Sequence, residues 1–172
     1  MAELTPRERL QPALLDRLTD DDPQNKLESR EKRVMTKAQL RQAVLRDLGW
    51  LFNATALASP ADFDRYPNVR RSVVNFGLPA LSGKTASTVE IADLERAVRE
   101  AILDFEPRLL ADSLSVRAVV TENQLDHHNV IGIEIQAQLW AQPMPLEMFV
   151  RTEIDLETGR VEIADLARVR DV

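Results

Sequence analysis

The stretch IGIEIQAQLW, residues 131–140, decides the fold of this 172-residue chain. An apolar residue stands at every second position from Ile131 to Leu139, and Gly132, Glu134 and two glutamines fill the positions between. A period of two places alternate side chains on opposite faces of a β-strand. We therefore predict a long strand with one face in the core and the other in solvent.

The same alternation appears on both sides of this stretch. Apolar and polar residues alternate at 114–120, before a polar turn at 122–129 that leads into the stretch. They alternate again at 146–156, after the stretch. Glu157, Thr158 and Gly159 then form a tight loop that leads into a short strand at 160–163. The pattern predicts an antiparallel sheet of about four strands that ends in a C-terminal hairpin.

Helical spacing dominates the chain before the sheet. Residues 36–53 carry apolar side chains at steps of three and four, with Thr36 as the cap and Asn53 at the end. Ser87 and Glu90 have the spacing of a capping box, and a strongly periodic helix follows until Pro107 stops it near Glu106. These two segments are predicted to be the principal helices.

A shorter helix is predicted between them. Pro67 suits its first turn, Val69, Val73 and Phe76 share a face at helical spacing, and Gly77 follows its end. Helices followed by an antiparallel meander indicate an α+β fold, with the helices packed on one face of the sheet.

The first 35 residues differ from the rest in composition. They are polar and charged, and Pro12 introduces a short segment with Leu14, Leu15 and Leu18 on one side. We predict a flexible arm, residues 1–35, that carries one short helix and docks through these leucines on a partner, followed by a single domain, residues 36–172.

The charge balance excludes several classes of partner. The chain has 22 basic and 28 acidic residues, a net charge of −6, and no cysteine. Neither Arg70 with Arg71 nor Lys32 with Arg33 forms an aromatic-interleaved basic patch, so no nucleic-acid binding is expected. The charged N-terminus and the lack of a long apolar run predict a cytoplasmic protein without direct membrane insertion.

No catalytic or metal-binding constellation is recognisable. Glu134, Glu147 and Glu153 fall on the polar face of predicted strands, and His127 and His128 are adjacent in a predicted exposed turn. We therefore predict no catalytic residue, no metal site and no cofactor. The 28 acidic residues leave a two-carboxylate glycosidase open as an alternative.

A proline between opposite charges marks the joint between the second principal helix and the first strand. Glu106 and Arg108 flank Pro107 there. Two interpretations are open. The charges are solvated beside a helix end, or they form a fixed corner in which Arg108 meets a partner carboxylate and Glu106 a partner cation.

Several motifs together resemble one family. The chain is similar to the TssE family of type VI secretion baseplate proteins, which is related to the sheath-initiator wedge protein of contractile phage tails and often labelled lysozyme-like. The similar stretches, in the family's order, are LLDRL at 14–18, VLRDL at 44–48, SVVNFGLP at 72–79, LSG at 81–83, EPR at 106–108 and RTEIDLETG at 151–159. The chain has Ala80 where the family often has Asp after Leu-Pro.

The resemblance implies a non-enzymatic structural protein in a baseplate near the inner membrane. It implies that the protein joins wedge proteins of the TssF, TssG and TssK type and initiates the sheath by strand pairing with TssB/TssC-type subunits. It assigns sheath attachment to Glu106, Pro107 and Arg108. The C-terminal strand, Arg160, Val161, Glu162 and Ile163, is the expected pairing edge. The alternative is a peptidoglycan-degrading glycosidase.

Overall fold

A computed structural model of the chain describes residues 12–19, 24, 35–57, 63, 65–81, 90–119, 130–141 and 143–165. Its elements, in chain order, are α1 (Leu14–Leu18), α2 (Lys37–Asn53), the 3-10 turns η1 (Pro67–Val69) and η2 (Val73–Asn75), α4 (Ile91–Phe105), the 3-10 turn η3 (Ala111–Ser113), β1 (Ser115–Val119), β2 (Val130–Leu139), β3 (Leu146–Asp155) and β4 (Val161–Asp165). The α+β prediction is confirmed, with the helices N-terminal to the strands.

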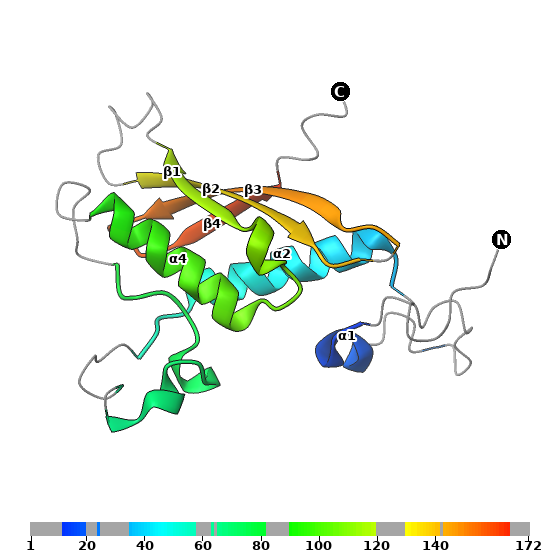
Figure 1. Ribbon diagram of the computed structural model, residues 1–172, viewed down its shortest axis with the longest axis horizontal. Coiled ribbons are helices and arrows are strands. Elements are labelled where there is room, and N and C mark those ends of the chain that lie inside the picture. Colours follow the sequence, from blue (N-terminus) through cyan, green and yellow to red (C-terminus); the bar gives the residue numbers. More distant parts are fainter. Residues whose placement is uncertain are drawn as a thin grey trace.

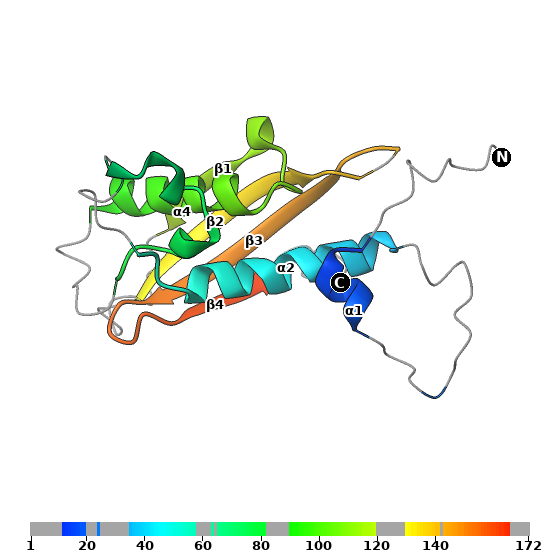
Figure 2. The same ribbon diagram turned by 90° about the horizontal axis from the view of Figure 1, so that it is seen from below.

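The four strands form one antiparallel meander in the order β1-β2-β3-β4. The pairing register places Arg117 opposite Glu134 and Glu134 opposite Arg151, so opposite charges alternate across the outer face. Figure 1 shows α2 and α4 together under the other face of the sheet. Seen from below, α4 lies beside β1 and α2 beside β4 (Figure 2). The helices thus cover one face and approach both edges.

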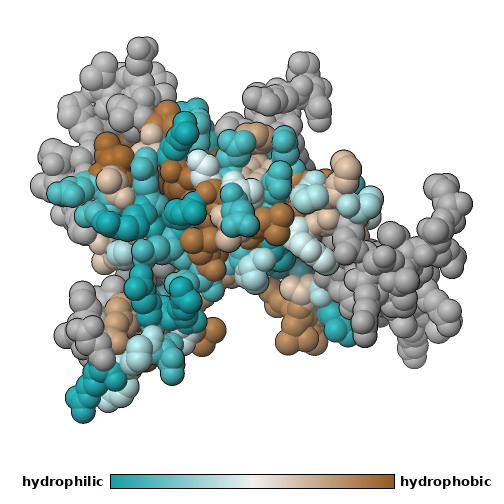
Figure 3. All heavy atoms as spheres, viewed as in Figure 1, coloured by the Kyte–Doolittle hydropathy of each residue, from teal (hydrophilic) through white to brown (hydrophobic). Residues whose placement is uncertain are grey.

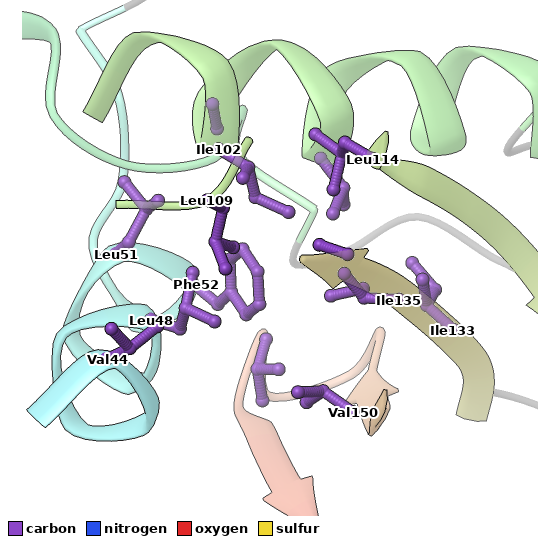
Figure 4. Packing of buried hydrophobic residues seen from close by; sticks show 14 of the residues in the cluster. Val44, Leu48, Leu51, Phe52, Ile102, Leu109, Leu114, Ile133, Ile135 and Val150 are labelled. Carbon is purple, nitrogen blue, oxygen red and sulfur yellow. The ribbon is translucent and has the colours of Figure 1, made fainter. Parts of the chain in front are cut away.

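The core lies between the two long helices and the sheet. Alternate residues of β2, from Ile131 to Leu139, are buried, and Glu134, Gln136 and Gln138 on the opposite face are exposed. Figure 4 shows how α2, α4 and the strands contribute to one packed cluster, which includes Val44, Leu48, Leu51, Phe52, Ile102, Leu109, Leu114, Ile133, Ile135 and Val150. The period-two prediction for the sheet is confirmed by this burial pattern.

The ends of the long helices follow the local sequence. Thr36 and Gln39 form a reciprocal capping box at the start of α2, which ends at Asn53 as predicted. Helix α4 ends at Phe105, before Pro107, also as predicted. The start of α4 differs from the predicted capping box, in which Glu90 is the third residue after the cap. Glu90 is itself the N-cap of α4 and makes no side-chain capping bond.

The predicted helix from Pro67 to Phe76 is wrong. The segment forms the separate turns η1 and η2, because Ser72 between them has extended backbone and its hydroxyl donates to the Val69 carbonyl at 2.9 Å. Val73 is 85% exposed, so a continuous helix would bury little apolar surface here. Gly77 has a φ of 131°, which ends the segment as expected of a glycine.

The C-terminal hairpin is built around Asp155. Its carboxylate accepts hydrogen bonds from the N–H groups of Glu157 and Thr158 and from the Thr158 hydroxyl, at 2.8 to 3.2 Å. These bonds lower the pKa of Asp155, with the Thr158 hydroxyl as the largest cause. Gly159 has a φ of 73°, typical of a bulge residue after such a turn. Strand β4 begins one residue later than predicted and extends two residues further.

Some predicted features lie outside the described residues. They are the capping role of Ser87, the linker at 26–33, the LSG loop beyond Leu81 and the turn with His127 and His128.

Candidate functional site

The Glu106-Pro107-Arg108 corner is an internal ion pair. Glu106 is 3% exposed, and the Arg108 fork meets both of its oxygens, with Nε to Oε1 at 2.6 Å and Nη2 to Oε2 at 2.5 Å. The Arg108 backbone N–H also donates to Glu106 at 3.2 Å. Glu106 is therefore neither a solvated charge nor free to receive a partner's cation, since its carboxylate already holds Arg108.

The backbone of the corner is fixed from two sides. The Glu106 N–H donates to the Ile102 carbonyl of α4 at 2.8 Å, and the Arg108 carbonyl accepts from the Trp140 N–H, just beyond β2, at 2.7 Å. Leu109 forms an isolated antiparallel bridge with Leu139. The corner consequently ties the end of α4 to the end of β2, and Arg108 has a defined position.

A chain of charges connects the corner to the N-terminal helix. Arg108 Nη2 also contacts Asp47 Oδ2 of α2 at 2.5 Å, and Arg46 pairs with Asp47 and with Asp16 of α1. Burial opposes the charge on Arg108, but its bonds to Glu106 and Asp47 outweigh that effect and raise its pKa. The hydrogen bond to Asp16 is the main reason that the pKa of Arg46 is also raised.

Helix α1 lies where the sequence predicts one short helix, and its leucines differ in their surroundings. It begins after an Ala13 N-cap, so Pro12 precedes its first turn. Leu14 and Leu18 are largely exposed, whereas Leu15 faces a hollow of about 300 Å³ between α1, α2 and the corner. Further residues that line this hollow are Trp50, Leu51, Phe76, Phe105 and Arg108. Leu15 is still 45% exposed, so all three leucines keep accessible surface, and docking through them stays a prediction.

Strand β4 is an edge of the sheet, and the direction of its backbone groups follows from the hairpin. The Asp155 N–H donates to the Arg160 carbonyl at 2.9 Å, which makes this a hydrogen-bonded pair. Such pairs alternate along an antiparallel ladder. Val161, Ile163 and Asp165 consequently turn their N–H and C=O groups away from β3.

The first of these outward residues is already paired. The Asn53 side chain, at the end of α2, accepts from the Val161 N–H at 3.0 Å and donates to the Val161 carbonyl at 2.9 Å. Helix α2 thus closes the start of the β4 edge, and the available edge begins at Ile163.

The opposite edge, β1, is covered by side chains of α4. Glu95 accepts from the Ala118 N–H at 2.7 Å, and Arg99 donates to the Leu114 carbonyl just before the strand. Because outward positions alternate, Val116 lies between these two contacts with its backbone groups directed outward as well. A charged side chain at each end of a short edge hinders the addition of another strand.

Comparison with known proteins gives one match. Residues 38–144 match the family model described as baseplate wedge protein gp25. The chain belongs to the baseplate wedge protein gp25 family. This family includes TssE of type VI secretion, so the resemblance stated from the motifs is confirmed at the family level. No curated protein and no solved structure matches the chain.

The gp25-family match covers only part of the candidate surfaces. It spans α2, the turns η1 and η2, α4, the Glu106-Pro107-Arg108 corner, β1 and β2. Helix α1 and strands β3 and β4 lie outside residues 38–144. The match therefore supports the corner as part of the family domain, whereas the arm and the β4 edge rest on this structure alone.

The glycosidase alternative concerns the acidic residues of this gp25-family chain. Glu134, Glu147 and Glu153 are exposed on the outer face of the sheet, and Glu106 is buried in its ion pair. Within the described residues, no group of three or more histidine, aspartate or glutamate side chains is placed to hold a metal ion. Helices of the described part of the chain are also too short or too polar to span a bilayer.

Proposed function

We propose that this baseplate wedge protein is a sheath initiator whose β4 edge pairs with a strand of the first sheath subunits. The family supports a structural role in a baseplate. The proposal extends that role to a contractile injection system of the type VI kind, assembled in the cytoplasm near the inner membrane. Sheath subunits of the TssB/TssC type and wedge proteins of the TssF, TssG and TssK type are the proposed partners.

The difference between the two sheet edges carries this proposal. Glu95 and Arg99 occupy both ends of the β1 edge, whereas Asn53 occupies only the start of β4. Ile163 and Asp165 direct backbone donors and acceptors outward, where an added strand forms main-chain hydrogen bonds. Strand addition is therefore favoured at β4.

The corner supports attachment by holding Arg108 in place. In the proposal, Glu106 and Pro107 are positioning residues, and Arg108 is the group that meets the partner. Among the described residues, the hydrogen bonds of Arg108 use Nε and Nη2, so Nη1 remains for a partner acceptor beside the hollow. A charged contact of this kind fixes the orientation of an added strand more than it adds affinity.

The arm is proposed to contact a wedge protein. Leu14 and Leu18 present adjacent apolar side chains on α1, and Leu15 and the Asp16–Arg46 ion pair hold the helix against α2. Exposed apolar residues one helical turn apart suit a groove on a partner. This contact leaves the β4 edge accessible to the sheath.

A pair of proline substitutions tests the strand-pairing proposal. Ile163→Pro removes an outward N–H from β4, and Val116→Pro removes the equivalent outward N–H from β1. Both residues are half-buried and pack against the core, so similar losses of stability are expected. Each variant is first checked for folding by circular dichroism and thermal unfolding.

Sheath assembly on baseplates is then measured by fluorescence microscopy of labelled sheath subunits in cells. We expect Ile163→Pro to abolish sheath foci and Val116→Pro to retain them. Retention of sheath foci in a folded Ile163→Pro variant, or equal loss in both variants, would contradict pairing at β4.

A further inference from the structure

The turns η1 and η2 form a projecting lobe, residues 65–78, with an unusual surface. Val73 is 85% exposed and Val74 is 61% exposed. Figures 1 and 2 place both turns at the end of the molecule away from α1, and Figure 3 shows that the surface of this end is mostly hydrophilic, with small apolar spots. Two adjacent β-branched residues in solvent have no evident role in the packing of the chain itself.

The lobe is held in one conformation by a dense set of local bonds. The Asn75 side chain donates to the Arg70 carbonyl at 3.0 Å, and the Asn75 N–H donates to the Ser72 carbonyl at 2.9 Å. Phe76 packs edge-on against Phe105 of α4, with ring centroids 5.3 Å apart. The exposed valines are thus presented on a rigid support.

The base of the lobe is equally fixed. The Leu78 N–H donates to the Ala54 carbonyl at 2.9 Å, and the Ala56 N–H donates to the Leu78 carbonyl at 2.8 Å. Gly77 has a positive φ, and a Cβ there would collide with the Ala54 carbonyl. A preorganised loop with valines, which have one dominant rotamer, loses little conformational entropy on binding.

The charge of the lobe is opposite to that of the whole chain. Residues 65–78 contain three arginines and no acidic residue, although the net charge of the protein is −6. Arg70 pairs with Glu100 through Nη2, and Arg71 pairs with Asp104 through Nε, both on α4. The Arg71 side chain is 80% exposed and its ion pair with the described residue Asp104 uses Nε, so its two terminal nitrogens remain for a partner.

We propose that Val73 and Val74, framed by Arg70 and Arg71, dock into an apolar pocket with an acidic rim on another baseplate wedge protein. The valines supply the apolar contact, and the guanidinium groups supply charge complementarity to carboxylates. A nucleic acid would satisfy the arginines but not the valines. The inference rests on the family's baseplate role and is independent of strand pairing at β4.

A photo-crosslinking experiment identifies the occupant. Val74 is replaced by p-benzoylphenylalanine in cells that assemble the complete baseplate, and the crosslinked peptide is sequenced by mass spectrometry. We expect a peptide of a wedge protein that contains apolar residues next to Asp or Glu. A crosslink to a sheath subunit, to another copy of this chain or to its own residues, or no crosslink in assembled baseplates, would overturn the proposal.

Binding by the purified full-length protein then tests the chemistry. The variant Val73→Thr/Val74→Thr keeps the β-branched shape of both side chains, and we expect it to weaken binding to that wedge protein about tenfold or more. Arg71→Glu should also weaken binding, and the loss of affinity should be larger at low salt than at high salt. Met144→Thr, at an exposed apolar residue in the β2–β3 connection, is the matched control and should leave binding unchanged.

Equal affinity of the valine variant and the Met144 control would overturn the proposal. Sheath foci provide the separate readout for β4. If Ile163→Pro retains sheath foci while the valine variant loses the wedge protein, strand pairing fails and the docking surface stands.

Discussion

Removal of Arg108 should destabilise the protein, because its partner Glu106 is buried. The substitution Arg108→Ala deletes both bonds of the guanidinium fork, at 2.6 and 2.5 Å, and the contact with Asp47. Glu106 would keep only the backbone N–H at 3.2 Å. Its charge would then be uncompensated in a site where the carboxylate is 3% exposed.

The magnitude follows from the burial of the two partners. Loss of one partner of a fully buried ion pair costs about 3 to 5 kcal/mol of unfolding free energy. The Arg108 side chain is 24% exposed, so water enters more readily when it is truncated, and we expect about 2 to 3 kcal/mol. For a chain of this size that corresponds to a fall in melting temperature of roughly 4 to 12 °C.

A double-mutant cycle distinguishes the ion pair from ordinary packing. Urea unfolding is measured for Arg108→Ala, Glu106→Gln and the double variant. If the charge of Glu106 is the cause, Arg108→Ala should cost less than about 1 kcal/mol in the Glu106→Gln background, since a neutral amide tolerates burial better. Additivity within about 0.5 kcal/mol would refute the reasoning.

Three further predictions concern other fixed points of the structure. Gly77→Ala should lower the unfolding free energy by at least about 2 kcal/mol in urea, because of its positive φ and the collision with Ala54. Asn53→Ala should cost about 1 to 2 kcal/mol and speed amide exchange at Val161, since both of its edge bonds are lost. The lowered pKa of Asp155 means that its ionised form stabilises the hairpin above the unfolded-state pKa. That contribution is lost as the pH falls through the lower folded-state pKa, so Asp155→Asn should differ in melting temperature from the wild type at pH 7 and less so at pH 2.

The sequence was sufficient for the elements whose signals are local. The alternation at 131–139 predicted the central strand and its buried face, and Thr36 and Pro107 marked a helix start and a helix end correctly. These features need only the period of apolar residues and the backbone chemistry of single residues.

The candidate site depends on contacts between distant residues, which local patterns do not show. Asp47 meets Arg108 across 61 positions, and Asn53 meets Val161 across 108. Asn53 was predicted only as the end of a helix, because nothing near it in the sequence indicates a strand edge. The split of residues 67–76 into two turns also has a tertiary cause, since Val73 finds no core to cover it.

The free β4 edge is too small to hold a partner by itself. Ile163 and Asp165 present at most about four outward hydrogen-bonding groups, and each hydrogen bond contributes about 1 kcal/mol net. Association costs at least about 4 kcal/mol before any affinity appears. An added strand therefore requires further contacts, for which the Arg108 corner and the side chains of the partner are the candidates. By the same arithmetic, Asn53 and the short open edge disfavour pairing between free copies of the chain, so strand addition should become stable where an assembled baseplate presents several edges together.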